Sequence, residues 1–117
     1  MTPVFDRGGR TIGWLNDSVV LDRSNRCRAF INNGAVYSYQ ALYLGTFDSG
    51  FFRDKHGRAV AFVLNASNGP LTPITQIPPI PPIPPIPPIP PIPPIAPIPP
   101  IPSLTWSGQA WDEFLAG

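Results

Sequence analysis

The strongest constraint on how this chain folds is a 16-residue unit that occurs four times in its first half. An internal repeat of this kind is a structural unit that needs its neighbours to bury a core. It therefore determines the expected architecture ahead of any local motif. The copies are VFDRGGRTIGWL from Val4, VLDRSNRCRAFI from Val20, VYSYQALYLGTF from Val36 and FRDKHGRAVAFV from Phe52.

Each copy predicts a β-hairpin, with a short apolar strand, a polar turn and a second strand of alternating character. In the first copy residues 4–6 lead into a turn at residues 7–9, and residues 10–15 lead out. Aspartate caps the backbone of such a turn, and glycine supplies the positive φ that it needs. Eight short strands at even spacing are typical of all-β folds. Because a lone hairpin is barely stable in water, we expect the four to share one core.

Alternation along the second strand predicts which side chains face that core. Gly13 and its equivalents are small in every copy, which we interpret as crowding of four backbones near a common axis. Leu15 and its equivalents share this face and are expected to fill the core. Trp14 and Ile12 are expected on the opposite face, where Trp14 and its aromatic equivalents would form an outer apolar layer. The small positions are Gly13, Ala29, Gly45 and Ala61, and the outer positions are Trp14, Phe30, Thr46 and Phe62.

This pattern resembles the small bacterial 4-fold beta flower proteins, in which four β-hairpins surround a pseudo-fourfold axis. The resemblance covers residues 4–63 and rests on the repeated D-x-x-G-R turn and the small-then-aromatic pair that follows it. It implies an all-β fold of four 16-residue hairpin repeats around a pseudo-fourfold axis. The family has no established activity, so the resemblance implies no catalytic residues.

An aspartate and an arginine bracket the turn in three of the copies, and both are missing from the third, which has Ser38 and Leu42. Joint loss is what a cross-turn ion pair predicts, and such an exposed pair contributes about 0–1 kcal/mol. The alternative is an anion site formed by arginines around the axis. The pairs are Asp6 with Arg10, Asp22 with Arg26, and Asp54 with Arg58, and the candidate anion-binding residues are Arg10, Arg26 and Arg58.

The chemistry-bearing residues do not favour an enzyme, a metal site or a bound cofactor. His56 is the only histidine and Cys27 the only cysteine, so no second such residue completes a zinc site. The spacing leaves a Cys27–His56 nucleophile pair open, but nothing supports it. Eight basic and seven acidic residues do not favour nucleic-acid binding. With one cysteine, no signal-like run and no membrane-length apolar stretch, we expect a cytoplasmic protein.

The second half of the chain repeats Ile-Pro-Pro over residues 77–102, with one lapse at Ala96. Polyproline II has three residues per turn, so the isoleucines line up along one edge. Fully extended, this arm would reach about 100 Å. It is interpreted either as a stiff spacer, or as an apolar edge that packs on another copy or a partner, or as a ligand for an aromatic-lined groove. The candidate partner-binding residues on this edge are Ile77, Ile80, Ile83, Ile86, Ile89 and Ile92.

The C-terminal tip is rich in aromatic residues. Ser107 is expected to cap a short helix that places Trp111, Phe114 and Leu115 on one face, with Trp106 just outside. Such side chains are costly to expose, so we expect the tip to dock, either on this or a sister β unit or on a partner. Trp106, Trp111 and Phe114 are the candidate partner-binding residues of the tip.

Together these patterns divide the chain into a β-repeat domain (1–68), a polyproline II arm (69–104) and an aromatic tip (105–117). The expected function is a non-enzymatic structural or interaction module. It would self-associate as a homo-oligomer or dock a protein partner through the arm and tip. The alternative is a module that binds an anion, a glycan or nucleic acid through the arginine and tyrosine surface of the repeats. In the divergent third copy Tyr37, Tyr39 and Tyr43 cluster, which fits either a binding face or drift.

Overall fold

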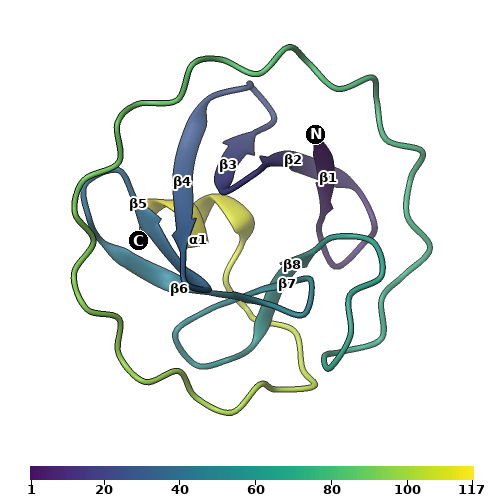
Figure 1. Cartoon of the computed structure of the whole chain (residues 1–117). Helices are drawn as coiled ribbons and strands as arrows, with labels where there is room; N and C mark the ends of the chain where they lie inside the picture. Colours follow the sequence, from purple (N-terminus) through teal and green to yellow (C-terminus); the bar gives the residue numbers. More distant parts are fainter.

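The computed structural model describes all 117 residues and shows an antiparallel β-barrel in which each strand pairs with its neighbours in sequence (Figure 1). The all-β prediction and the short C-terminal helix are confirmed. No helix has the length and apolar character needed to cross a membrane. The strands are β1 (Thr2–Phe5), β2 (Thr11–Asn16), β3 (Val19–Asp22), β4 (Cys27–Asn32), β5 (Ala35–Ser38), β6 (Tyr43–Asp48), β7 (Phe51–Arg53) and β8 (Ala59–Phe62), and the helix is α1 (Trp111–Ala116).

One turn structure recurs along the barrel with the period of the sequence repeat. Asp6 Oδ1 accepts hydrogen bonds from the backbone N–H groups of Gly8 and Arg10, at 2.9 and 3.0 Å. A β-bulge lies beside each of these turns, and the residue three after each capping side chain has a positive φ. The predicted capping is thus confirmed, with a serine serving in the third copy. The other capping side chains are Asp22, Ser38 and Asp54, and the positive-φ residues are Gly9, Asn25, Ala41 and Gly57.

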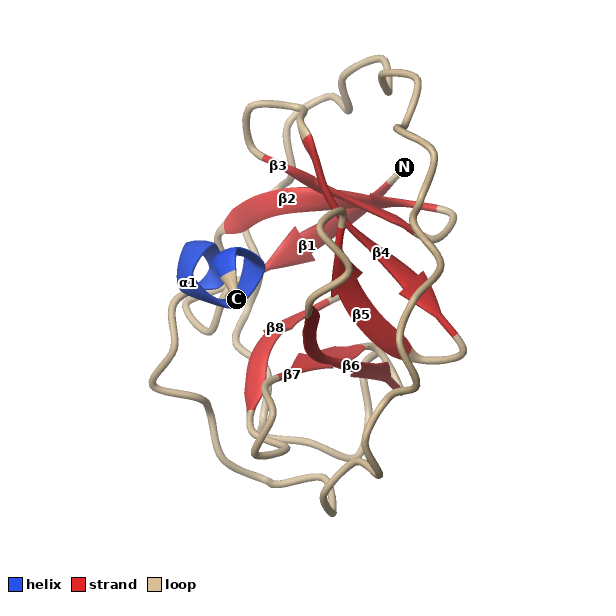
Figure 2. Ribbon diagram, turned by 90° about the vertical axis from the view of Figure 1, so that its left-hand side faces the viewer, coloured by secondary structure: helices blue, strands red, loops and turns tan.

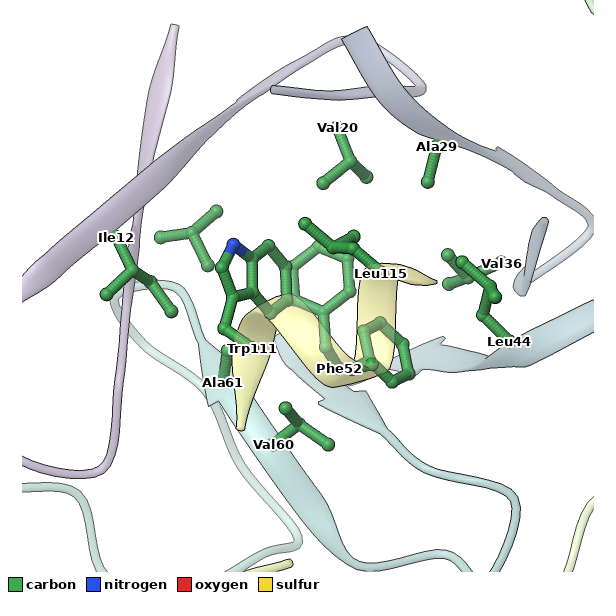
Figure 3. Close-up of a cluster of buried hydrophobic side chains, with 12 residues drawn as sticks. Ile12, Val20, Ala29, Val36, Leu44, Phe52, Val60, Ala61, Trp111 and Leu115 are labelled. Carbon is green, nitrogen blue, oxygen red and sulfur yellow. The ribbon is translucent and has the colours of Figure 1, made fainter. Parts of the chain in front are cut away.

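The core of the barrel combines side chains from the strands with those of α1, which sits at one open end (Figures 2 and 3). Trp111 and Leu115 insert among Val20, Val36 and Phe52 in Figure 3. Leu15 and its equivalents pack partly buried against this cluster, and Phe30 and Phe62 belong to separate outer clusters, as predicted. The placement of Ile12 on the face opposite the core is wrong, because α1 fills the mouth of the barrel and brings Ile12, Leu44 and Val60 into the central core.

The small positions face the interior as predicted, but the crowding has a different source. A Cβ atom on Gly13 would meet the carbonyl oxygen of Leu21 on the neighbouring strand. At Gly45 it would meet the carbonyl oxygen of Arg53 and lie 2.9 Å from Phe114 Cε1. The limit is therefore set by the adjacent strand and by α1, rather than by four backbones meeting at an axis.

The proline-rich arm does not project from the barrel. It encircles the strands, as Figure 1 shows, and the whole molecule measures only 37 × 35 × 21 Å. Of the interpretations left open by the sequence, a stiff spacer reaching about 100 Å does not describe this structure. After this circuit residues 105–107 lie beside β8, where Ala59 donates to Thr105 and accepts from Ser107 through backbone hydrogen bonds. The chain then enters α1.

Candidate interaction surface

Ten isoleucines, among the most exposed apolar side chains of the molecule, form a ring around the barrel. We call this ring the isoleucine belt; its members are Ile74, Ile77, Ile80, Ile83, Ile86, Ile89, Ile92, Ile95, Ile98 and Ile101. Their exposed fractions lie between 89% and 100%. Soluble monomers rarely expose apolar patches larger than a few hundred Å² unless these are interaction sites. The six candidate residues from Ile77 to Ile92 all remain accessible here.

The belt contacts the barrel at equivalent turn positions of the hairpins, with a constant number of arm residues for each hairpin. Asn25 Nδ2 donates to the carbonyl oxygen of Ile83 at 2.8 Å. Gly9, at the equivalent turn position, lies so close to the Ile74 carbonyl that a Cβ atom would collide with it, and Gly57 lies similarly against Ile101. Ile74 and Ile83 are nine residues apart, and Ile83 and Ile101 twice nine. Three triplets of the arm therefore correspond to one hairpin, which keeps the contacts in register around the barrel.

At the third hairpin the tyrosine cluster holds the arm instead. The Tyr37 hydroxyl donates to the carbonyl oxygen of Pro94 at 2.7 Å. Ala96, the lapse in the Ile-Pro-Pro pattern, packs against a cluster of Phe30, Ala35 and Tyr37, as do Tyr39 and Tyr43. The divergent third copy thus contacts this chain's own arm. The alanine that interrupts the Ile-Pro-Pro pattern lies where the arm meets these aromatic side chains.

Arg53 joins the two ends of the arm. Its Nη1 donates to the carbonyl oxygens of Gly57 and Ser103, at 2.8 and 2.9 Å, and its Nη2 donates to that of Asn68 at 2.6 Å. Its side chain is only 2% exposed, and burial lowers the pKa of its guanidinium. Sequence reasoning missed this residue. The available signal was the substitution of arginine where the other copies have Phe5, Leu21 and Tyr37.

The tip docks inside this chain's own barrel. Trp111 is 8% exposed and Phe114 is 1% exposed, and their rings stack with centroids 5.7 Å apart. Trp106 is half-buried against Phe51 and Phe62. Assigning Trp111 and Phe114 to a partner surface is therefore wrong for this structure, because both complete the core.

Ser107 does not cap the helix as predicted. Its hydroxyl donates to Asp54 Oδ2 at 2.5 Å, so it fastens the tip to the turn of the fourth hairpin. The helix begins after Ala110, whose backbone N–H donates to Glu113 Oε1 at 3.0 Å.

This combination of a closed barrel, bulged turns at a constant period and a helix in the mouth can be compared with known proteins. Residues 2–115 match the family described as 4-fold beta flower protein. The chain belongs to this family. The match reaches well beyond the repeats, through the arm and into α1. No curated protein and no solved structure matches the chain significantly.

The arginines of the beta flower turns form two of the three predicted ion pairs. Arg10 lies 3.3 Å from Asp6, and Arg26 lies 3.8 Å from Asp22. The pair predicted between Asp54 and Arg58 is wrong, because Ser107 bonds to the free carboxylate oxygen of Asp54. The candidate anion-binding residues Arg10 and Arg26 thus already have carboxylate partners in the turns.

The Asp22 side chain accepts three hydrogen bonds, as those of Asp6 and Asp54 do, but two different arginines lie against its carboxylate. Burial alone would raise its pKa, but hydrogen bonds from Arg26, Arg28 and Ser24 outweigh burial and lower the pKa. The Arg28 guanidinium contributes a contact of 3.2 Å. Asp22 is therefore held in its charged form.

The remaining reactive side chains of the beta flower fold are not assembled into a metal site. No group of three or more His, Cys, Asp or Glu side chains is placed to bind a metal ion. Cys27 is half-buried, and burial raises the pKa of its thiol, which disfavours the nucleophilic thiolate. His56 is exposed in the turn of the fourth hairpin.

Proposed function

We propose that this beta flower protein is a non-enzymatic interaction module that self-associates through its isoleucine belt. The observation that carries the proposal is the near-complete exposure of ten isoleucines in one continuous ring. A chain that only needed a strap around its barrel would have no use for a large apolar side chain at every third position. The tip contributes indirectly, since α1 anchors the arm that presents the belt.

The free energy available from burying the belt favours association through several weak contacts over a single strong one. Burying four isoleucines in one contact would contribute about 6–12 kcal/mol. The loss of translational and rotational freedom on association costs about 4–15 kcal/mol. A single contact is therefore marginal, but a ring offers contacts on several sides, and these add through effective concentration. We expect association that increases with protein concentration.

The alternative, a ligand-binding module using Arg10, Arg26, Arg58 and the tyrosine surface, has less support. Two of these arginines pair with aspartates, and Tyr37 bonds to the arm. Docking of a different protein on the belt would use the same side chains and is distinguished by the experiment below.

The test compares the full chain with a belt variant carrying Ile80→Thr, Ile83→Thr, Ile86→Thr and Ile89→Thr. The mass in solution is measured by multi-angle light scattering across a concentration series. We expect the wild-type mass to rise above the monomer mass of 12.7 kDa as concentration increases, and the belt variant to remain monomeric. Because these side chains are 89–95% exposed, their replacement should leave the melting temperature unchanged.

Leu42→Thr with Leu64→Thr is the matched control, since both leucines are about half exposed but lie outside the belt. This control should associate like the wild type. A wild-type chain that stays monomeric at every concentration would contradict self-association and leave the belt to a different partner. A belt variant that associates as strongly as the wild type would assign the contact to another surface.

A further inference from the structure

A cavity of about 290 Å³ lies between the last part of the arm and the barrel. Its walls come from β6, from Arg53 on β7, from the turn before β5 and from arm prolines at positions 97–102. No hydrogen bond joins residues 95–102 to the barrel, although Pro94 and Ser103 on either side are bonded. The arm thus forms a wall that is hydrogen-bonded at both ends and held between them by packing, with Ala96 on the aromatic cluster and Ile101 close to Gly57.

The cavity exists because two neighbouring residues depart from the repeat. Thr46 stands where the other copies have Trp14, Phe30 and Phe62, so a bulky ring is missing. Arg53 stands where they have apolar or aromatic side chains. Thr46 and Arg53 are directly paired between β6 and β7, and both line the cavity. One substitution creates the space, and the other introduces a positive charge into its wall.

The guanidinium of Arg53 has unused hydrogen-bonding capacity. Arginine carries five N–H donors, and three of those on Arg53 reach backbone carbonyls. The Nε–H is shielded from solvent and has no partner, and no carboxylate forms an ion pair with this side chain. Asp48 favours the charged guanidinium from beyond ion-pair distance, but it leaves the buried Nε–H without a partner. A buried donor without a partner is unfavourable, and a carboxylate is the group that an arginine side chain matches best.

The other residues that line the cavity indicate the apolar character and the charge of the ligand. Tyr43, Phe47 and the proline rings supply apolar surface, as is usual in small-molecule sites with a few polar groups that fix orientation. Asp48 also lines the cavity, and its negative charge disfavours ligands with more than one negative charge. We propose that this cavity binds a small monocarboxylate with an apolar body. The carboxylate lies on Arg53 and the body under the arm, in the space that Thr46 leaves open.

The test uses the ¹⁵N-labelled full chain and three probes: benzoate, its neutral isostere benzamide, and sulfate. Benzoate should shift the Nε–H resonance of Arg53 saturably, with a Kd of about 1 mM or tighter. Benzamide should bind about tenfold or more weakly, because it lacks the charge that meets Arg53. Sulfate should bind more weakly as well, because it has no apolar body and carries two charges.

Thr46→Phe restores the aromatic side chain of the repeat and fills the cavity without touching the hydrogen bonds of Arg53, so it should abolish the benzoate shift. Thr72→Phe, at an exposed position outside the cavity, is the matched control and should bind like the wild type.

Three results would overturn the proposal. They are an unsaturable response to benzoate, equal binding of benzamide or sulfate, and undiminished benzoate binding in a folded Thr46→Phe variant. The comparison of probes on the wild-type chain decides the question even if that variant does not fold. None of these outcomes depends on self-association through the belt.

Discussion

Replacing Phe114 by alanine tests whether α1 is part of the barrel's core or a detachable tail. The side chain is 1% exposed, and its ring lies 5.7 Å from that of Trp111 and 6.4 Å from that of Phe52, measured between centroids. Truncating a buried phenylalanine to alanine costs about 3–5 kcal/mol. Domains of this size have a total stability of about 5–15 kcal/mol, so the loss is a large share of it. At about 4 °C per kcal/mol, the melting temperature should fall by roughly 12–20 °C.

The assay is thermal unfolding followed by far-UV circular dichroism for the strands and by tryptophan fluorescence, to which the tip contributes two of the three tryptophans. We expect both signals of Phe114→Ala to move together, because strands and helix share one core. Asp112→Ala is the control, since this side chain is exposed on the same helix and should change stability by no more than about 0.5 kcal/mol. Strands that melt at the wild-type temperature in Phe114→Ala, with only the fluorescence altered, would refute the reasoning.

Two further predictions concern the arm and the turns. Deleting residues 86–88 shortens the arm by about 9 Å between its contacts with Asn25 and Tyr37. We expect at least one of these hydrogen bonds to break, lowering the free energy of unfolding in urea by about 1 kcal/mol for each. The control Ile86→Thr should leave this free energy unchanged. A deletion variant as stable as the wild type would contradict the match between arm triplets and hairpins. Asp22 has a lowered pKa, so its charge stabilises the fold above the unfolded-state value of about 3.9, and this contribution is lost as the pH falls towards the folded value. The stability difference between wild type and Asp22→Asn, measured by urea unfolding at each pH, should shrink over this acid range, and a constant difference would exclude the proposed role of the charge.

The hairpins were predictable because their determinants are local. Asp6 and its equivalents cap backbone groups two and four residues away, so the turn chemistry is contained in a few adjacent positions. The third copy follows the same rule with Ser38, whose hydroxyl reaches the same two N–H groups. The alternation that placed Leu15 on the core face is likewise a property of each strand alone.

The predictions that proved wrong concern residues whose partners come from distant parts of the chain. Local spacing favoured Arg58 as the partner of Asp54, but Ser107 takes that oxygen from 53 residues away. Ile12 was assigned by alternation, yet α1 covers it from outside the hairpin. The path of the arm depends on the match between three triplets and one hairpin, and that match cannot be recognised before the barrel's perimeter is known.

The asymmetry of the repeats has a topological reason. A ring made from a linear chain needs a beginning and an end, and in this molecule both meet at the fourth hairpin. Arg53 bonds to Asn68 just before the arm and to Ser103 near its end, which no apolar side chain at that position could do. Arg53, whose guanidinium closes the ring, keeps an unpartnered Nε–H and lines the cavity together with Thr46. In this molecule the arginine that breaks the repeat is therefore the residue that joins the two ends of the arm, and the proposed ligand site lies where the ring closes.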